Sequence, residues 1–162
     1  MVDSLHKSYN LMVEANLHRL KAISRSYGGQ EGHEDLLQEM LYQLWKSYSS
    51  FKGDSQLATW VYRVALNTAI SFTRSRYKKP KLVSEVDLDF SEPHHSGDIE
   101  ASMDTLEQFL LSLGKVDRAI VLLYLDDIPH QQISEITGQS VNSIGVRINR
   151  MKLRFKQQHV DD

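Results

Sequence analysis

Apolar residues recur every three to four positions through the first half of the chain, and this spacing predicts three helices. The first runs over residues 5–27 and ends at Gly28-Gly29, and the second runs over residues 33–48. The third covers about residues 55–76 and is stopped by Pro80. Amphipathic helices bury their apolar faces against one another, so this half predicts a small helical domain.

Helical spacing returns in the second half, over residues 104–113 and 116–125. A short third helix is expected within residues 129–138, between a proline and a glycine. Ser140 is then placed to cap a last helix over residues 141–158. A helix, a short turn with glycine and a second helix with a basic tail form the helix-turn-helix pattern.

The last predicted helix has two faces of different chemistry. Its apolar face is expected to pack on Ile133 and Ile136 of the preceding helix. That face consists of Val141, Ile144, Ile148, Met151 and Phe155. The other face carries side chains short enough to approach base edges and phosphates in a major groove, namely Asn142, Ser143, Val146, Asn149 and Arg150. The residues expected to contact DNA are Asn142, Ser143, Arg147, Asn149, Arg150 and Lys152. The pattern alone also fits an ordinary amphipathic surface helix.

Residues 80–103 lack a sustained apolar period and contain two of the three prolines, so we interpret them as a flexible linker. The fold is therefore expected to be all-α, with two small helical domains at residues 1–79 and 104–162. The net charge of −2 is unevenly spread. Residues 1–80 carry eleven Lys and Arg against seven Asp and Glu, whereas residues 81–105 carry one lysine against seven carboxylates. The acidic linker thus masks two locally basic regions, a pattern typical of nucleic-acid binding.

Composition and motifs exclude several classes of protein. The absence of cysteine excludes disulfides and thiolate metal sites, and no run of about 18 apolar residues could span a membrane. The first residues lack a signal-peptide pattern, which favours a cytoplasmic location. No nucleophile–base pairing or phosphate-binding glycine loop is present, so we expect no enzyme activity, cofactor or small-molecule substrate. His94-His95 with Asp98 lacks the spacing of a metal site, and none is expected.

The third predicted helix and the loop before it interleave aromatic and cationic residues. Aromatic rings stack on unpaired bases while cations hold the backbone, so this region is suited to single-stranded DNA. Trp60 and Phe72 share the apolar stripe and are expected in the core. Tyr62, Arg63 and Asn67 are expected to point away from it.

The most specific motifs lie in the first half, and their order and spacing resemble region 2 of extracytoplasmic-function sigma factors. They are Asp35-Leu36-Leu37-Gln38-Glu39, Leu44-Trp45-Lys46, Phe51-Lys52-Gly53-Asp54-Ser55 and Thr59-Trp60-Val61-Tyr62-Arg63-Val64-Ala65-Leu66-Asn67. The second half is similar to sigma region 4 through Leu113, Arg118, Leu122 and the segments 133–136 and 147–152. Together the resemblance covers nearly the whole chain apart from the linker.

The resemblance implies an alternative sigma factor that binds core RNA polymerase, directs it to specific promoters and helps to melt the −10 element. Core polymerase would be bound by Asp35, Leu36, Gln38, Glu39, Leu44 and Trp45. The −10 element, with a flipped base, would be bound by Phe51, Lys52, Gly53, Asp54, Ser55, Tyr62, Arg63, Asn67, Arg74 and Arg76. The last helix would read the −35 element. The family also implies an anti-sigma factor as a partner.

The chain departs from the family pattern at three places. Gly114 stands where a proline is usual, and Gln131-Gln132 replaces an acidic pair. Gly145-Val146 occupies positions where many members carry a cation and a serine, so the −35 contacts are assigned to the polar residues around this pair. Two other functions fit the residues: a free-standing helix-turn-helix regulator, and a protein-interaction module that binds no DNA.

Overall fold

The computed structural model describes residues 1–78 and 98–159, with side chains for residues 1–75 and 104–159. Every regular element in these ranges is an α-helix: α1 (Val2–Tyr48), α2 (Leu57–Lys78), α3 (Asp98–Ser112), α4 (Lys115–Leu125), α5 (His130–Thr137) and α6 (Val141–His159). The all-α prediction is confirmed. Pro80 and most of the acidic segment, including His94 and His95, lie outside the described residues.

Helix α1 is interrupted at Gly29, whose φ of 67° and ψ of −168° lie outside the helical region. Glycine adopts this conformation readily because it has no Cβ to clash with the backbone. A Cβ on Gly28 would lie 2.7 Å from the Cα of His33, so the turn at the break also depends on this glycine. The predicted helix end is confirmed, but the chain resumes its helix directly after Gly29 instead of at His33.

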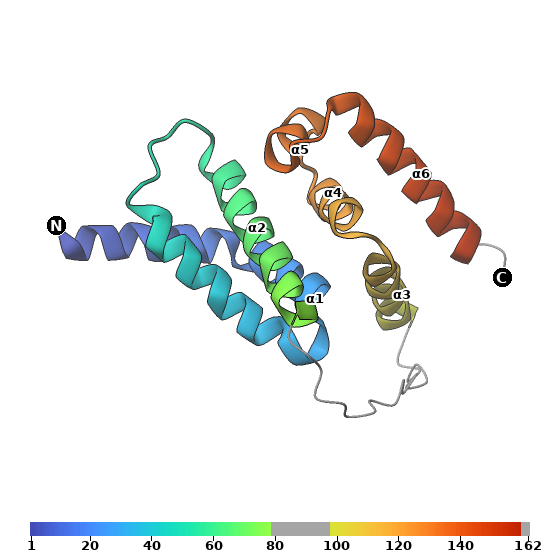
Figure 1. The fold of residues 1–162 in the computed structure, drawn as a ribbon, viewed down its shortest axis with the longest axis horizontal. Helices are drawn as coiled ribbons and strands as arrows, with labels where there is room; N and C mark the ends of the chain where they lie inside the picture. Colours follow the sequence, from blue (N-terminus) through green and yellow to red (C-terminus); the bar gives the residue numbers. More distant parts are fainter. Residues whose placement is uncertain (79–97, 160–162) are drawn as a thin grey trace.

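The two parts of α1 and helix α2 form a three-helix unit (Figure 1). Its centre is made of fully buried apolar side chains, namely Leu20, Leu36, Met40, Leu44, Val61 and Ala65. Trp60 and Phe72 pack against this core and are half-buried, as expected. Tyr62 is only 4% exposed, because Arg19 of α1 lies over its ring and Asp126, at the end of α4, accepts from its hydroxyl. The prediction that Tyr62 points away from the core is therefore wrong.

Helices α3 to α6 form a second unit around Ile120, Leu123, Ile133 and Ile144, all fully buried. Helix α3 begins at Asp98 and not at the predicted residue 104. The added turn has little apolar periodicity, which is why the pattern missed it.

The helix-turn-helix forms as predicted. Helix α5 ends at Gly138, which adopts a left-handed φ of 75°, and the Ser143 backbone N–H donates to the Ser140 hydroxyl oxygen at 3.2 Å. The apolar face of α6 packs on α4 and α5. Val141 was expected in this face but is exposed, because it stands in the first turn of α6, at the edge of the contact with α5.

The two units are in direct contact, with α2 beside α5 and with α1 against α3 and α4 (Figure 1). The Tyr27 hydroxyl donates to the Lys115 carbonyl at 2.6 Å. The Arg118 guanidinium donates to the Ser26 carbonyl at 2.8 Å and to three carbonyls at the end of α3. Arg118 therefore links the two units, because it donates hydrogen bonds to backbone carbonyls at the end of a helix in each of them.

Candidate nucleic-acid interface

The side of α6 that faces away from α4 and α5 is polar and basic. Asn142, Asn149 and Arg150 are exposed there, while Ile144 and Ile148 are buried on the opposite side. Helix α6 carries five Lys and Arg and no carboxylate. The structure therefore brings these three predicted DNA-binding residues together on one exposed, electropositive face.

The other three residues of the predicted −35 set, Ser143, Arg147 and Lys152, have partners within the protein. Arg147 donates through Nη1 to Asp117 Oδ1 at 2.5 Å and through Nε to the Ser143 hydroxyl oxygen at 3.3 Å. The ion pair with Asp117 joins α6 to α4. Lys152 is exposed, with its ammonium 4.6 Å from the centre of the Tyr124 ring.

The loop between α1 and α2 presents a second group of predicted residues. The Phe51 ring packs on Trp60, with ring centres 5.2 Å apart, and is half-buried. Lys52 and Asp54 are exposed on either side of Gly53, whose left-handed φ of 76° allows the tight turn. Ser55, the last predicted residue of the loop, is half-exposed. Phe51 therefore anchors the loop, and the polar residues after it project outward.

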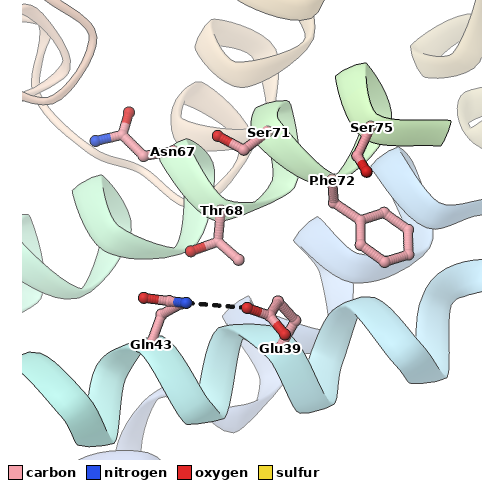
Figure 2. Close-up of a pocket in the computed structure, with 7 residues that line it drawn as sticks. All are labelled: Glu39, Gln43, Asn67, Thr68, Ser71, Phe72 and Ser75. Carbon is pink, nitrogen blue, oxygen red and sulfur yellow. Dashed lines mark hydrogen bonds between the residues drawn. The ribbon is translucent and has the colours of Figure 1, made fainter. Parts of the chain in front are cut away.

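Asn67 lies apart from this loop, in a groove between α1 and α2 with a volume of about 560 Å³ (Figure 2). The groove is lined by Glu39, Gln43, Asn67, Thr68, Ser71, Phe72 and Ser75. Gln43 donates to Glu39 at 2.9 Å on the α1 side, and the Asn67 side chain points away from α1. The lining of the groove thus includes both Glu39, which is expected to bind polymerase, and Asn67, which is expected to bind DNA. No residue of the Phe51–Ser55 loop lines it.

The contact between the two units uses two residues that were predicted to bind the −10 element. The Tyr62 hydroxyl donates to Asp126 Oδ2, and the same carboxylate oxygen lies 2.8 Å from Nε of Arg19. Arg63 donates to the Glu135 carbonyl at 3.0 Å. Burial raises the pKa of the Tyr62 hydroxyl above that of a free tyrosine, and the hydrogen bond to Asp126 raises it further.

No local pattern in the sequence indicates this contact, and the sequence by itself predicts that Asp126-Asp127 is a solvated helix end. That interpretation is wrong for Asp126, which is paired, and fits Asp127, which is exposed. Arg19 also lies over the Tyr62 ring, 5.5 Å from its centre. Periodicity could not have found these partners, because they come from α1, α2 and the end of α4.

Arg74 is exposed near the end of α2, and the side chain of Arg76 lies outside the described side chains. In the second part of α1, Asp35, Gln38 and Glu39 are exposed. Their outward direction agrees with a role in binding a partner protein.

Leu36 and Leu44 were expected to bind polymerase, but both are 0% exposed. They share one helix face with Met40 and form the core between α1 and α2, so a direct contact with another protein is ruled out in this structure. Trp45 is 37% exposed and packs against His6 and Tyr9 from the start of α1, at centre-to-centre distances of 4.8 and 5.0 Å. The first turns of α1 therefore cover one side of Trp45.

Across the described helices, none is long and apolar enough to cross a membrane. No cluster of three or more His, Cys, Asp or Glu side chains suited to a metal ion occurs within the part of the chain that the structure describes.

Two family models match the chain. Residues 12–79 match sigma-70 region 2, and residues 103–155 match sigma-70 region 4. Both regions occur in the expected order and together span most of the chain.

The chain belongs to the sigma-70 family.

Curated relatives place the sigma factor in the extracytoplasmic-function group. It is 28% identical over 160 residues to the ECF RNA polymerase sigma-E factor of Escherichia coli K12, which covers 90% of this chain and 83% of the relative. It is 26% identical over 161 residues to the sigma-E factor of Haemophilus influenzae, with 90% of this chain and 84% of the relative covered.

Two solved structures have the same fold. CnrH in complex with the cytosolic domain of CnrY aligns with a TM-score of 0.71 at 16% identity, covering 97% of this chain and 90% of that chain. RpoE in complex with the anti-sigma factor NepR from Bartonella quintana aligns with a TM-score of 0.72 at 21% identity, covering 93% and 96%.

The protein is thus an alternative sigma factor, a transcription initiation factor that binds core RNA polymerase and directs it to promoter DNA. A free-standing helix-turn-helix regulator is not favoured, because the first half of the chain matches sigma region 2 and not a separate regulatory domain.

Proposed function

We propose that the sigma factor reads the −35 element with α6, through the exposed residues Asn142, Asn149 and Arg150. Asparagine can pair with adenine and arginine with guanine in the major groove. Lys152 would hold a phosphate, and Ser143 and Arg147 would join the contact from the edge of the same face. The observation that supports this most strongly is that the outward face of α6 carries exposed amide and cationic side chains and no carboxylate.

We further propose that the loop from Phe51 to Ser55 and residue Asn67 receive the −10 element as single-stranded DNA, with Arg74 and Arg76 holding its backbone. The exposed polar residues of the loop and the groove at Asn67 support separate contacts with neighbouring nucleotides. Tyr62 and Arg63 are engaged by the second unit, so they would reach DNA only after α2 separates from α4 and α5. The proposed division is residues 1–79 for this function and residues 104–162 for −35 binding, with an acidic segment over residues 80–103 between them whose last residues begin α3.

Core polymerase would dock on the exposed residues of the second part of α1, namely Asp35, Gln38, Glu39 and Trp45. Leu36 and Leu44 would support this surface from the core beneath it. As in the similar structure of RpoE with NepR, an anti-sigma factor is a proposed partner. The sigma factor would act in the cytoplasm, hold no cofactor and catalyse no reaction of its own.

Run-off transcription with purified core RNA polymerase tests these assignments. Trp45→Ala should weaken binding to core polymerase and lower all transcription, because it truncates the largest exposed side chain of the docking surface. Arg150→Ala should retain polymerase binding and lose preference for the −35 sequence. Tight promoter binding by the isolated sigma factor, equal to that of the holoenzyme, would contradict the proposal.

A further inference from the structure

Val146 stands out on the DNA-facing side of α6 because it is apolar and 60% exposed. It lies two residues from Ile144 and two from Ile148, which is roughly half a helical turn in either direction. Since those two isoleucines are buried, Val146 projects away from the body of the protein. The burial of Met151 on the same side as the two isoleucines holds α6 in this orientation.

The residues around Val146 are the ones that could bind bases. Asn142, Asn149 and Arg150 stand four residues before it and three and four residues after it, so they are its neighbours on the helix surface. A hydrophobic side chain surrounded by base-reading polar groups has no protein partner to pack against. Val146 can therefore contact the same ligand that these polar side chains bind.

Gly145 adds a second observation at the same place. A Cβ built on Gly145 meets nothing within 4 Å, so neither a neighbouring helix nor a side chain requires glycine there. Its backbone is helical, so a positive φ does not require glycine either. This glycine leaves open space beside Val146. The open space allows the helix backbone to come close to a bound DNA duplex.

In the major groove, thymine is distinguished by its C5-methyl group, which apolar side chains contact, whereas the other bases are read through hydrogen bonds. We infer that Val146 packs on the 5-methyl group of a thymine in the −35 element, with Gly145 allowing the helix to come close enough. This inference rests on the proposed reading of the −35 element by α6. It makes Val146 a specificity-determining residue, because cytosine at that position lacks the methyl group.

The test uses holoenzyme assembled from the full chain and core RNA polymerase of the same organism. A −35 sequence selected by this holoenzyme from a randomised library is synthesised with each thymine replaced in turn by deoxyuridine, which lacks only the methyl group. Binding at one thymine should weaken about fourfold, the effect of one buried methyl-sized group. Val146→Ala should remove this sensitivity, because the alanine side chain does not reach the methyl group.

Leu153→Ala is the matched control. Leu153 is 61% exposed and lies seven residues after Val146 on the same side of α6, so its truncation removes a similar exposed apolar group. This variant should remain sensitive to deoxyuridine. If no thymine is sensitive, or if Val146→Ala stays as sensitive as the wild type, the inference is wrong.

Arg150→Ala separates that failure from a failure of the proposed function. Loss of −35 preference in Arg150→Ala without any methyl dependence at Val146 would reject only the thymine contact. Unchanged −35 preference in Arg150→Ala would reject the proposed role of the whole α6 face. Val146 and Arg150 are both exposed, so neither substitution removes a core contact, and circular dichroism verifies the fold of each variant.

Discussion

Weakening the hydrogen bond between Tyr62 and Asp126 is the most direct test of how the two helical units are held together. The Asp126 carboxylate accepts from the Tyr62 hydroxyl and pairs with Arg19 at 2.8 Å. The substitution Asp126→Asn keeps the size of this side chain and removes its charge. We expect the two units to separate more readily in this variant, which would expose Tyr62.

The size of the effect follows from the two interactions that change. A hydrogen bond to a charged acceptor contributes about 1.5–3 kcal/mol and a neutral one about 0.5–1.5 kcal/mol, so the substitution loses about 1–1.5 kcal/mol there. The ion pair adds about 0.5 kcal/mol, because the Arg19 and Asp126 side chains are 27% and 29% exposed and solvent screens the pair. The expected total of about 1.5–2 kcal/mol corresponds to roughly a 10- to 30-fold shift from joined to separated units.

The chain contains no cysteine, so two introduced cysteines can carry a fluorescent donor and acceptor without background labelling. Lys52→Cys and Gln157→Cys place the dyes on exposed positions of the two units. Energy transfer is then followed in the free protein as urea is raised to concentrations below the unfolding transition. In Asp126→Asn, transfer should fall at a lower urea concentration than in the parent.

Asp127→Asn is the control for this experiment. Asp127 is the adjacent carboxylate, it is exposed, and its φ of 56° is tolerated by asparagine as well as by aspartate. The two variants therefore make the same chemical change at neighbouring positions. If both lose energy transfer at the same urea concentration, the charge of Asp126 does not hold the units together and the reasoning is refuted.

Three further predictions concern the stability of the fold. Gly29→Ala should lower the free energy of unfolding in urea by about 1–3 kcal/mol, because the backbone conformation of Gly29 is nearly restricted to glycine. Gly114→Ala should instead raise the free energy of unfolding by up to about 1 kcal/mol, because Gly114 has a φ of −63° and open space around it. Arg118→Lys should cost about 2–4 kcal/mol, because one ammonium cannot bond all four carbonyls that the guanidinium reaches; unchanged stability would contradict this role. The raised pKa of Tyr62 means that the stability from its contact is fully present below the ordinary tyrosine pKa and is lost as pH rises above it. Alkaline denaturation should therefore be weaker in Tyr62→Phe, and an identical pH dependence in both proteins would exclude the effect.

Some residues of the candidate site could be placed on the surface from the sequence, and others could not. Asn142, Asn149 and Arg150 were placed correctly on an exposed face, because the apolar spacing of α6 determines which side is buried. Leu36 and Leu44 were predicted to contact polymerase but are buried. A sequence motif identifies a helix as part of an interface, but it does not show which of the helix's side chains are buried.

Local features of this protein followed from the sequence by itself. The break at Gly29, the turn at Gly138 and the cap at Ser140 were all predicted, since each depends on atoms within about one helical turn. Apolar spacing also predicted that every described element is a helix, because a period of about 3.6 residues distinguishes helices from strands.

Only the tertiary structure decided which polar residues are already engaged within the protein. Tyr62 bonds to Asp126, 64 residues along the chain, and Arg147 bonds to Asp117, 30 residues away. No local pattern encodes such pairs, because they depend on how separate helices pack.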